Sequence, residues 1–459
     1  MKDLTNGNIS RNFIKFSIPV LIGTLMSLAF NLVDTVIAGK MLGEQSLAAI
    51  SSLGTFVTVI TCTMSGIVNG ATGLLSKNFG AKQYRYFKYD VITTLIAVVS
   101  IDVILSILCV SFVYPLMRVM RVDTAITEQA ALYFRIYMGG LVFIQLDNTF
   151  VCVLHSMGIS LFPMIMSIVA GCINLAGNII SALVLPKNIA VGGIAAFSVF
   201  AAFVADAVMT IKICKCIDSF GVKECKYKFK FSRIKIIFHF GGPSMLQQFI
   251  MYISGLVLSP IINSVGYTAT AGYAVANKIY SVCANSYGAF SKVLGTFVAQ
   301  CSGAKKYSLI KKGFRINLLQ CAGLTVPILV FASVFAEKIC GLFFKPEDYG
   351  GISHIYATDF VRYFLPFVVI NMFAHEVHSF CRGIVKLNWL NIMTATGSGS
   401  RILFGLLFGL STGALSGVYG VYLGWVLCWV FEAFVGIYVM FRYRTEERIK
   451  KAVISGYDV

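Results

Sequence analysis

Twelve long apolar segments restrict what this chain can fold into. They cover roughly residues 13–39, 47–75, 91–117, 130–155, 161–185, 189–211, 236–262, 269–299, 316–336, 356–381, 387–410 and 416–441. A helix needs about 20 mostly apolar residues to cross a bilayer. The segments are continuously apolar rather than alternating, which favours helices over the strands of a membrane barrel. We therefore predict an all-α integral membrane protein with twelve transmembrane helices.

The composition excludes a soluble fold. Hydrophobic residues make up 57% of the chain and charged residues 13%, whereas soluble proteins usually carry about a quarter charged residues. The net charge is +18. The basic residues stand in short clusters between apolar segments, unlike the single face or stripe of a nucleic-acid binder. We expect lipid around most of the chain and no nucleic-acid partner.

The same basic clusters predict the orientation of the helices. If the N-terminus is inside, the inner segments hold most of the lysines and arginines, including those of 77–88, 212–235 and 442–451. Lysine and arginine accumulate in cytoplasmic loops. Both termini are therefore expected in the cytoplasm, with the protein in the plasma membrane, as in a prokaryotic inner membrane. These loops also suit anionic lipid headgroups at the cytoplasmic face.

The two halves of the sequence repeat each other at an offset of about 224 residues. "NFGAKQY", ending at Tyr84, matches "CSGAKKY", ending at Tyr307, and "FSIPVLIG" near Pro19 matches "FGGPSMLQ" near Pro243. In this alignment Asp206 and Glu432 fall at similar depths. A chain with such repeats is typical of transporters that bind substrate between two lobes.

The long hydrophilic stretch between the halves predicts the domain boundaries. We expect an N-terminal lobe over residues 1–211, a basic cytoplasmic linker over 212–235 and a C-terminal lobe over 236–459. Six helices in each half make the repeats parallel, so the lobes are expected to be related by a pseudo-two-fold axis along the membrane normal.

Asp34 is an acid inside the first apolar segment, in "NLVDTVIAGK". An ionised carboxylate in hydrocarbon costs at least about 2.5 kcal/mol on insertion scales. Asp34 is therefore either paired near the outer end of its helix, for example by Asn31 or a neighbouring helix, or its charge is used for function.

A second polar group in the first half is "QLDN" in the fourth segment, which contains Gln145, Asp147 and Asn148. These side chains can line a substrate cavity, or they can join helices through hydrogen bonds, as is common in membrane bundles. Asp102 and Asp206 are further intramembrane acids for which structural pairing is the alternative to a functional role.

The second half offers both acidic and basic candidates. In "HEVH" of the tenth segment, His375 and Glu376 can face a cavity, where Glu376 would balance a cationic substrate; pairing of Glu376 with Arg382 is the alternative. Lys278 and Arg401 can recognise an anionic group, or they can reach the interface or pair with nearby acids. We find no nucleophile–base set, metal-ligand set or phosphate loop, so we expect neither an enzyme nor a cofactor.

Several stretches resemble the multidrug and toxic compound extrusion (MATE) family, within the wider flippase-like superfamily. They cover nearly the whole chain and include "IPVLIGTLMSLAFNLVDTVIAGKMLG", "NGATGLLSKNFGAK", "AGYAVANKIYS", "FCRGIVKLNW" and "SRILFGLLF". The resemblance implies twelve helices in two lobes and cation-coupled export of amphipathic, often cationic, compounds.

The resemblance also implies a coupling site. Asp34 matches the acid of the first helix that binds the coupling proton or sodium ion in many members, and Asn174 matches a polar position of the same site in the fifth helix. Asn178 replaces the acid usually found four residues later. Asn31 and Asn174 can supply oxygen ligands to a sodium ion. No other metal site is expected.

The sequence therefore predicts a monomeric secondary active exporter of small amphipathic, cationic molecules, working by antiport with protons or sodium through alternating access. The alternative is a flippase for lipids or lipid-linked oligosaccharides. Twelve spans argue against the flippase, whereas Lys278, Lys292 and Arg401 favour it.

Overall fold

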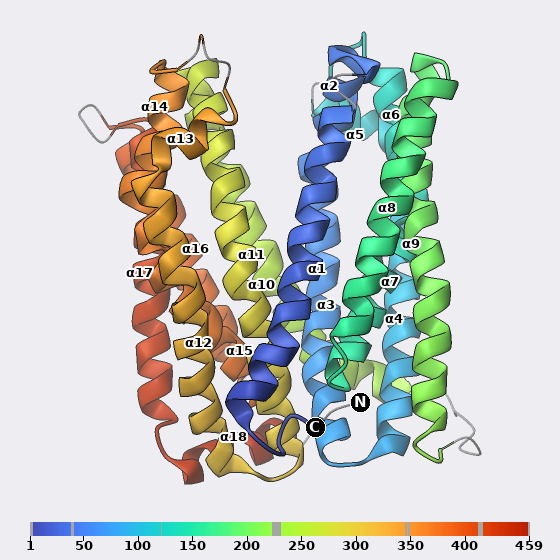
Figure 1. The fold of residues 1–459 in the computed structure, drawn as a ribbon, viewed down its shortest axis with the longest axis vertical. Coiled ribbons are helices and arrows are strands. Elements are labelled where there is room, and N and C mark those ends of the chain that lie inside the picture. The colour runs from blue at the N-terminus through green and yellow to red at the C-terminus, as the bar shows by residue number, and fades with distance from the viewer. Residues whose placement is uncertain are drawn as a thin grey trace. The chain divides into compact units, whose positions relative to one another are not determined.

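The computed structural model describes residues 3–37, 41–120, 122–222, 231–344, 347, 349–411 and 416–457. Within these ranges, the structure does not describe the side chains of residues 31, 32, 34–36, 44, 47, 55, 187, 188, 231 and 457. Every regular element in the described ranges is a helix (Figure 1). The predicted all-α class is confirmed.

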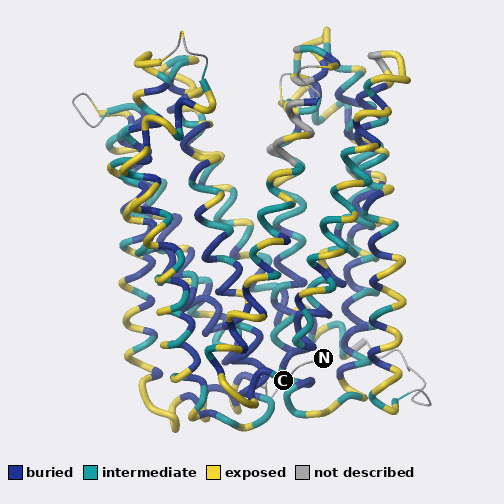
Figure 2. Tube along the Cα trace, in the orientation of Figure 1, coloured by how far each residue is buried: buried dark blue, intermediate teal, exposed yellow. Residues whose placement is uncertain are grey.

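The helices form two compact units. The first unit contains residues 1–3 and 18–245, and the second contains residues 4–17 and 246–459. In each unit, buried and exposed residues alternate along most of the helices (Figure 2). The lobe boundaries given above, at 1–211 and 236–459, rest on the sequence and stay a prediction.

The first unit begins within α1 and ends within α10. Its helices are α1 (Ile9–Ile37), α2 (Glu44–Ser52), α3 (Gly54–Gly80), α4 (Tyr84–Ser111), α5 (Val113–Val119), α6 (Thr127–Gly139), α7 (Leu141–Ser156), α8 (Leu161–Val184), α9 (Lys187–Asp218) and α10 (Phe231–Val265).

The second unit continues from α10 to the end of the chain. Its further helices are α11 (Tyr267–Gly303), α12 (Tyr307–Val334), α13 (Ala336–Gly341), α14 (Ile352–Asp359), α15 (Val368–Gly383), α16 (Leu387–Gly409), α17 (Val418–Arg442) and α18 (Glu446–Tyr457). A π-helical turn, Phe360–Phe364, and a 3₁₀ turn, Leu365–Phe367, join α14 to α15.

These helices account for the twelve predicted spans. Among the described residues, nine spans are long and apolar enough to cross a membrane, and α6 with α7, bent by 44°, can form a tenth. The remaining two predicted spans correspond to α11 and α16, which are long enough but more polar. They carry Lys278, Lys292 and Arg401.

The predicted linker, 212–235, is helical at both ends. α9 continues to Asp218 and α10 already begins at Phe231, while residues 223–230 lie outside the described ranges. A basic helix end can project beyond the hydrocarbon and keep its backbone hydrogen bonds, so the loss of hydropathy does not mark the end of the helix.

Glycines on α3 bring α10 very close in the first unit. A Cβ atom on Gly66 would lie 2.5 Å from Met245 Cα, and one on Gly70 would lie 2.1 Å from the Phe240 carbonyl oxygen. Gly66 and Gly70 have the four-residue spacing that lets membrane helices pack backbone to backbone. This contact fixes the first part of α10 within the first unit.

The N-terminal stretch packs within the second unit. Phe13 makes an edge-to-face contact with Phe297 at 4.9 Å, and both rings are fully buried. The Leu4 amide donates to Gln300 Oε1 over 3.1 Å, and Gln320 Nε2 donates to Ser10 Oγ over 2.6 Å. These contacts explain why residues 4–17 belong to the second unit.

The repeated "GAK" motif forms the same turn in both halves. After α3, Lys82 has φ +57° and the Gln83 amide donates to the Asn78 carbonyl over 2.9 Å. After α11, Lys305 has φ +58° and the Lys306 amide donates to the Cys301 carbonyl over 2.9 Å. This is the hydrogen-bond pattern of a helix end closed by a left-handed residue, a position that favours glycine.

Replacing the left-handed lysine by glycine should therefore stabilise the protein. For Lys82→Gly we expect a gain of about 0.5–1 kcal/mol, because glycine removes the steric cost of a side chain at positive φ. Thermal unfolding in detergent measures the change. Gln83→Gly is the control, since Gln83 has φ −85° and should gain no stability; an equal gain in both variants would contradict the assignment.

Candidate functional site

The best-defined candidate for the ion site lies between α8 and α9 in the first unit. Asn178 Nδ2 donates to Asn174 Oδ1 over 2.8 Å, and Asn174 Nδ2 donates to Ser198 Oγ over 2.7 Å. Asn178 is fully buried. The structure brings Asn174 and Asn178 together, as their spacing of four predicts. It adds Ser198, a lone serine in an apolar segment that gives no signal in the sequence.

Glycines allow α8 and α9 to approach each other around these asparagines. A Cβ atom on Gly177 would lie 2.1 Å from Phe197 Cγ, and one on Gly193 would lie 2.6 Å from Ser181 Oγ. The close approach lets short amide side chains bond across the helices.

The side chains of Asn31 and Asp34 lie outside the description, but the packing of α1 against α8 is visible further down both helices. A Cβ atom on Gly23 would lie 3.4 Å from Met164 Cα, and one on Gly171 would lie 2.0 Å from Phe30 Cε2. The two contacts have the same separation in sequence (164 minus 23 and 171 minus 30 both give 141). The helices therefore run in the same direction, and this register places position 34 level with position 175.

Gln145 on α7 is a helix–helix contact in the first unit. The side chain is fully buried, and its Nε2 donates to the Thr61 carbonyl on α3 over 3.0 Å. Its Oε1 accepts from Ser65 Oγ at 3.3 Å and from Asn148 Nδ2 at 3.1 Å. Asn148 is exposed, so of these two amides only Asn148 presents a surface to a ligand.

Two carboxylates lie near each other on α7 and α9. Asp147 is half-buried, and Asp206 is 5% exposed. They are close enough to interact electrostatically. Neither carboxylate oxygen of Asp206 has a hydrogen-bond partner within the described residues. Asp206 is thus an acid in the membrane-spanning part of the first unit that the described packing does not satisfy.

Glu376 on α15 is enclosed by the second unit. It is fully buried, its Oε1 accepts from Ser291 Oγ at 3.0 Å and its Oε2 accepts from Asn317 Nδ2 at 2.7 Å. The predicted contact between Glu376 and a cationic substrate therefore requires these bonds to α11 and α12 to open. His375 packs its ring edge-on against Tyr287, with ring centroids 5.2 Å apart.

The basic candidates of the second unit differ in burial. Lys278 and Lys292 are exposed on α11. Arg401 on α16 is half-buried, with its guanidinium 4.4 Å from the centre of the Trp425 ring and Nη1 3.4 Å from Ser254 Oγ. Across the described residues, none of these three cations forms an ion pair. Pairing of these cations with acids stays an alternative prediction.

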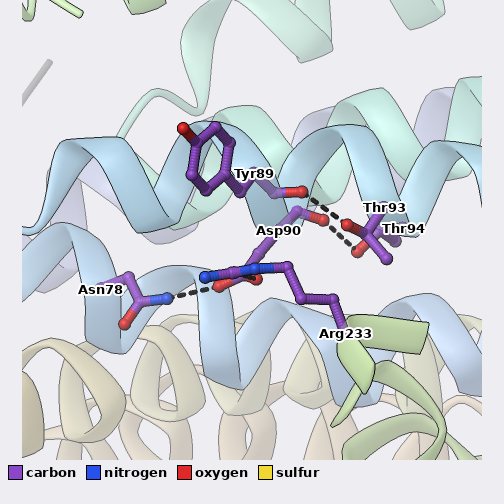
Figure 3. Close-up of polar contacts among 6 residues, drawn as sticks. All are labelled: Asn78, Tyr89, Asp90, Thr93, Thr94 and Arg233. Carbon is purple, nitrogen blue, oxygen red and sulfur yellow. Dashed lines mark hydrogen bonds and ion pairs between the residues drawn. The ribbon is translucent and has the colours of Figure 1, made fainter. Parts of the chain in front are cut away.

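A buried ion pair that the sequence analysis missed joins α10 to α3 and α4 (Figure 3). Arg233 Nη1 donates to Asp90 Oδ1 over 2.5 Å, and Asn78 Nδ2 donates to Asp90 Oδ2 over 2.5 Å. The guanidinium also lies 5.2 Å from the centre of the Tyr89 ring. Its residues are far apart in the sequence, so no local pattern marks the pair.

Two units of long apolar helices, each with hydrogen-bonded polar clusters inside the bundle, define a multi-span membrane protein. The sequence profile of the family described as MatE matches residues 19–180 and again residues 243–414. The chain therefore belongs to the MatE family, whose members are transporters rather than enzymes.

Individual relatives are distant but cover most of the chain. "Probable multidrug resistance protein YoeA" of Bacillus subtilis (strain 168) is 22% identical over 359 residues, or 76% of each chain. An "FAD transporter" of Shewanella oneidensis is 25% identical over 410 residues, 81% of this chain and 87% of the relative. A crystal structure of MATE in complex with MaL6 superposes with a TM-score of 0.89 at 20% identity, covering 98% of both chains. The fold is thus that of twelve-helix, two-lobe MATE transporters.

Breaking the Asp90–Arg233 pair from one side should destabilise the first unit. Arg233→Met leaves the Asp90 carboxylate buried without its cation, and losing one partner of a buried pair costs about 3–5 kcal/mol. We expect a lower midpoint of thermal unfolding in detergent, and substantial recovery in Asp90→Asn/Arg233→Met.

Arg85→Met is the matched control. Arg85 bonds to the Tyr89 hydroxyl at 3.1 Å on the exposed side of α4, so its loss should change the midpoint little. Equal losses for Arg85→Met and Arg233→Met would contradict a structural role for the ion pair.

Proposed function

We propose that this chain is a secondary active exporter of amphipathic small molecules in the plasma membrane, with both termini in the cytoplasm. Antiport with protons or sodium drives it through alternating access. In this proposal, Asp34 binds the coupling ion. Asn174, Asn178 and Asn31 are the polar residues that surround it.

The single observation that most supports this proposal is the register of α1 against α8. Position 34 is level with position 175, so an acid on α1 stands at the height of the Asn174–Asn178 pair. Carboxylate and amide oxygens are the ligands that hard cations prefer. An acid in a membrane span is also a functional candidate by default.

Coupling follows if substrate and cation prefer different states of Asp34. On the outer side, a proton or sodium ion binds at Asp34 and favours release of substrate. On the inner side, the ion leaves and substrate binds again. Such exchange requires only that each ligand has a different affinity for the two conformations.

The charge of the substrate has two candidate assignments. A cationic substrate follows from the family resemblance and would use the acids of the membrane spans, such as Asp147. An anionic substrate with an aromatic ring is favoured by Arg401, a half-buried cation over the Trp425 ring that forms no ion pair among the described residues. A relative named an FAD transporter, which carries an anionic aromatic compound, supports this second assignment.

The coupling role is tested by transport in liposomes with separately imposed proton and sodium gradients. For Asp34→Asn we expect gradient-driven efflux of ethidium or carboxyfluorescein to fall to the leak rate, because the amide neither binds a proton nor carries the charge that holds sodium. Asp123→Asn, on an exposed loop, is the control and should keep wild-type rates. Undiminished gradient-driven efflux by Asp34→Asn would overturn its role.

The charge assignment is tested with the same vesicles. If Arg401 binds an anion, Arg401→Gln should reduce carboxyfluorescein efflux by about tenfold to a hundredfold, since a hydrogen bond to a charged group contributes about 1.5–3 kcal/mol. It should leave ethidium efflux unchanged. Arg118→Gln, exposed on α5, is the matched control. Efflux of ethidium alone by the wild type favours the cationic assignment, and transbilayer movement of labelled lipid without dye efflux favours the flippase.

A further inference from the structure

The second unit contains a buried acid–base pair that the coupling scheme above does not use. His378 Nε2 on α15 lies 3.3 Å from Glu432 Oε1 on α17. The exposed fractions of these side chains are 2% and 10%. Both residues lie within apolar spans, where an ionisable group costs free energy unless it is paired or functional.

A third residue fixes which nitrogen of His378 carries the proton. Gln247 Nε2 on α10 lies 3.1 Å from His378 Nδ1. An amide nitrogen only donates, so Nδ1 must accept, and a neutral imidazole then carries its proton on Nε2, the nitrogen that lies 3.3 Å from Glu432 Oε1. This arrangement can take up one further proton, on the Glu432 oxygen.

The titratable groups around the pair lie on α15, α16 and α11. On α15, His375 and Arg382 act on His378, and on α16 Arg401 acts on Cys428, four residues before Glu432. On α11, Tyr280 and Tyr287 interact with Glu432. Glu376, two residues before His378, is already bonded to Ser291 and Asn317. Among the described residues, Glu432 is the one carboxylate at ion-pair distance from His378.

The sequence repeat gives an independent indication. Glu432 lies at a similar depth to Asp206 of the first half. Asp206 is also buried in its own unit, and both of its oxygens lack hydrogen-bond partners within the described part of the chain. Both halves thus have an acid at a similar depth. Asp206 lacks hydrogen-bond partners among the described residues, and Glu432 pairs with His378. Helix packing alone does not require either acid.

We propose that the His378–Glu432 pair is a proton-binding site of the second unit, and that Gln247 connects this site to α10. The proposal rests on the ion-coupled transport proposed above. A proton bound at Glu432 converts the carboxylate to a neutral acid, so the His378 ring loses the negative charge 3.3 Å from its Nε2. A proton on Nδ1 instead prevents Gln247 from donating to the ring. The first placement changes the contact between α15 and α17, and the second changes the contact between α15 and α10, a helix that belongs partly to each unit.

The number of protons exchanged per molecule of dye tests this site. In liposomes loaded with carboxyfluorescein or ethidium and a pH indicator, we expect Glu432→Gln to transport dye with one proton fewer per dye than wild type, and with a flatter dependence on external pH. Glu432→Asp keeps a titratable group, so it should restore the proton count and shift the pH profile. Glu447→Gln, exposed on α18, is the control.

The outcomes separate this inference from the proposed function. Wild-type protein that moves dye without any counterflow of protons or sodium overturns the function. The inference alone is overturned if the wild type performs antiport and Glu432→Gln keeps the wild-type proton count and pH profile. It is also overturned if the wild type performs antiport that is driven by sodium without proton movement. If Glu432→Gln does not fold, a proton count in Glu432→Asp equal to wild type with an unshifted pH profile overturns it.

Discussion

The structure depends on one constraint, which is that a polar group inside a membrane must find its partner within the protein. In each unit, several buried polar side chains find partners on helices of the same unit, whereas both carboxylate oxygens of Asp206 lack a hydrogen-bond partner among the described residues. Gln145 bonds to α3, and Asn174 and Asn178 bond to each other and to α9. Glu376 is held by α11 and α12. These networks join helices within a unit, so they favour units that stay intact during transport.

Two helices, α1 and α10, have residues in both units. α10 is anchored to the first unit by Arg233, Asp90 and the glycines of α3, and beyond Met245 it belongs to the second unit, where Gln247 meets His378. α1 is anchored in the second unit by Phe13 and continues into the first. A change of protonation or ion binding next to either helix is therefore well placed to alter both units.

Much of the fold could be predicted because hydropathy and repeats are properties of the sequence alone. The apolar segments indicate all twelve spans, and the "GAK" repeat indicates turns that prove to share a left-handed lysine. The predicted ends were less accurate. α9 extends to Asp218, because hydropathy marks the edge of the hydrocarbon rather than the last hydrogen bond of a helix.

The candidate site was only partly predictable. Asn174 and Asn178 are four residues apart on one helix, so their contact follows from helical geometry. Arg233 with Asp90, and His378 with Glu432, join residues 143 and 54 positions apart in the chain. No local pattern specifies such partners, since they depend on which helices pack together and at what register.

The most direct test of the central claim is to measure the flux of substrate and of ions together, in the same vesicles of wild-type protein, at a clamped membrane potential. The account predicts that efflux of ethidium or carboxyfluorescein is matched by inward movement of protons or sodium in a fixed ratio, and that dye moves uphill when only the ion gradient is imposed. Dye efflux that proceeds at the same rate without either gradient, and without ion counterflow, would contradict it.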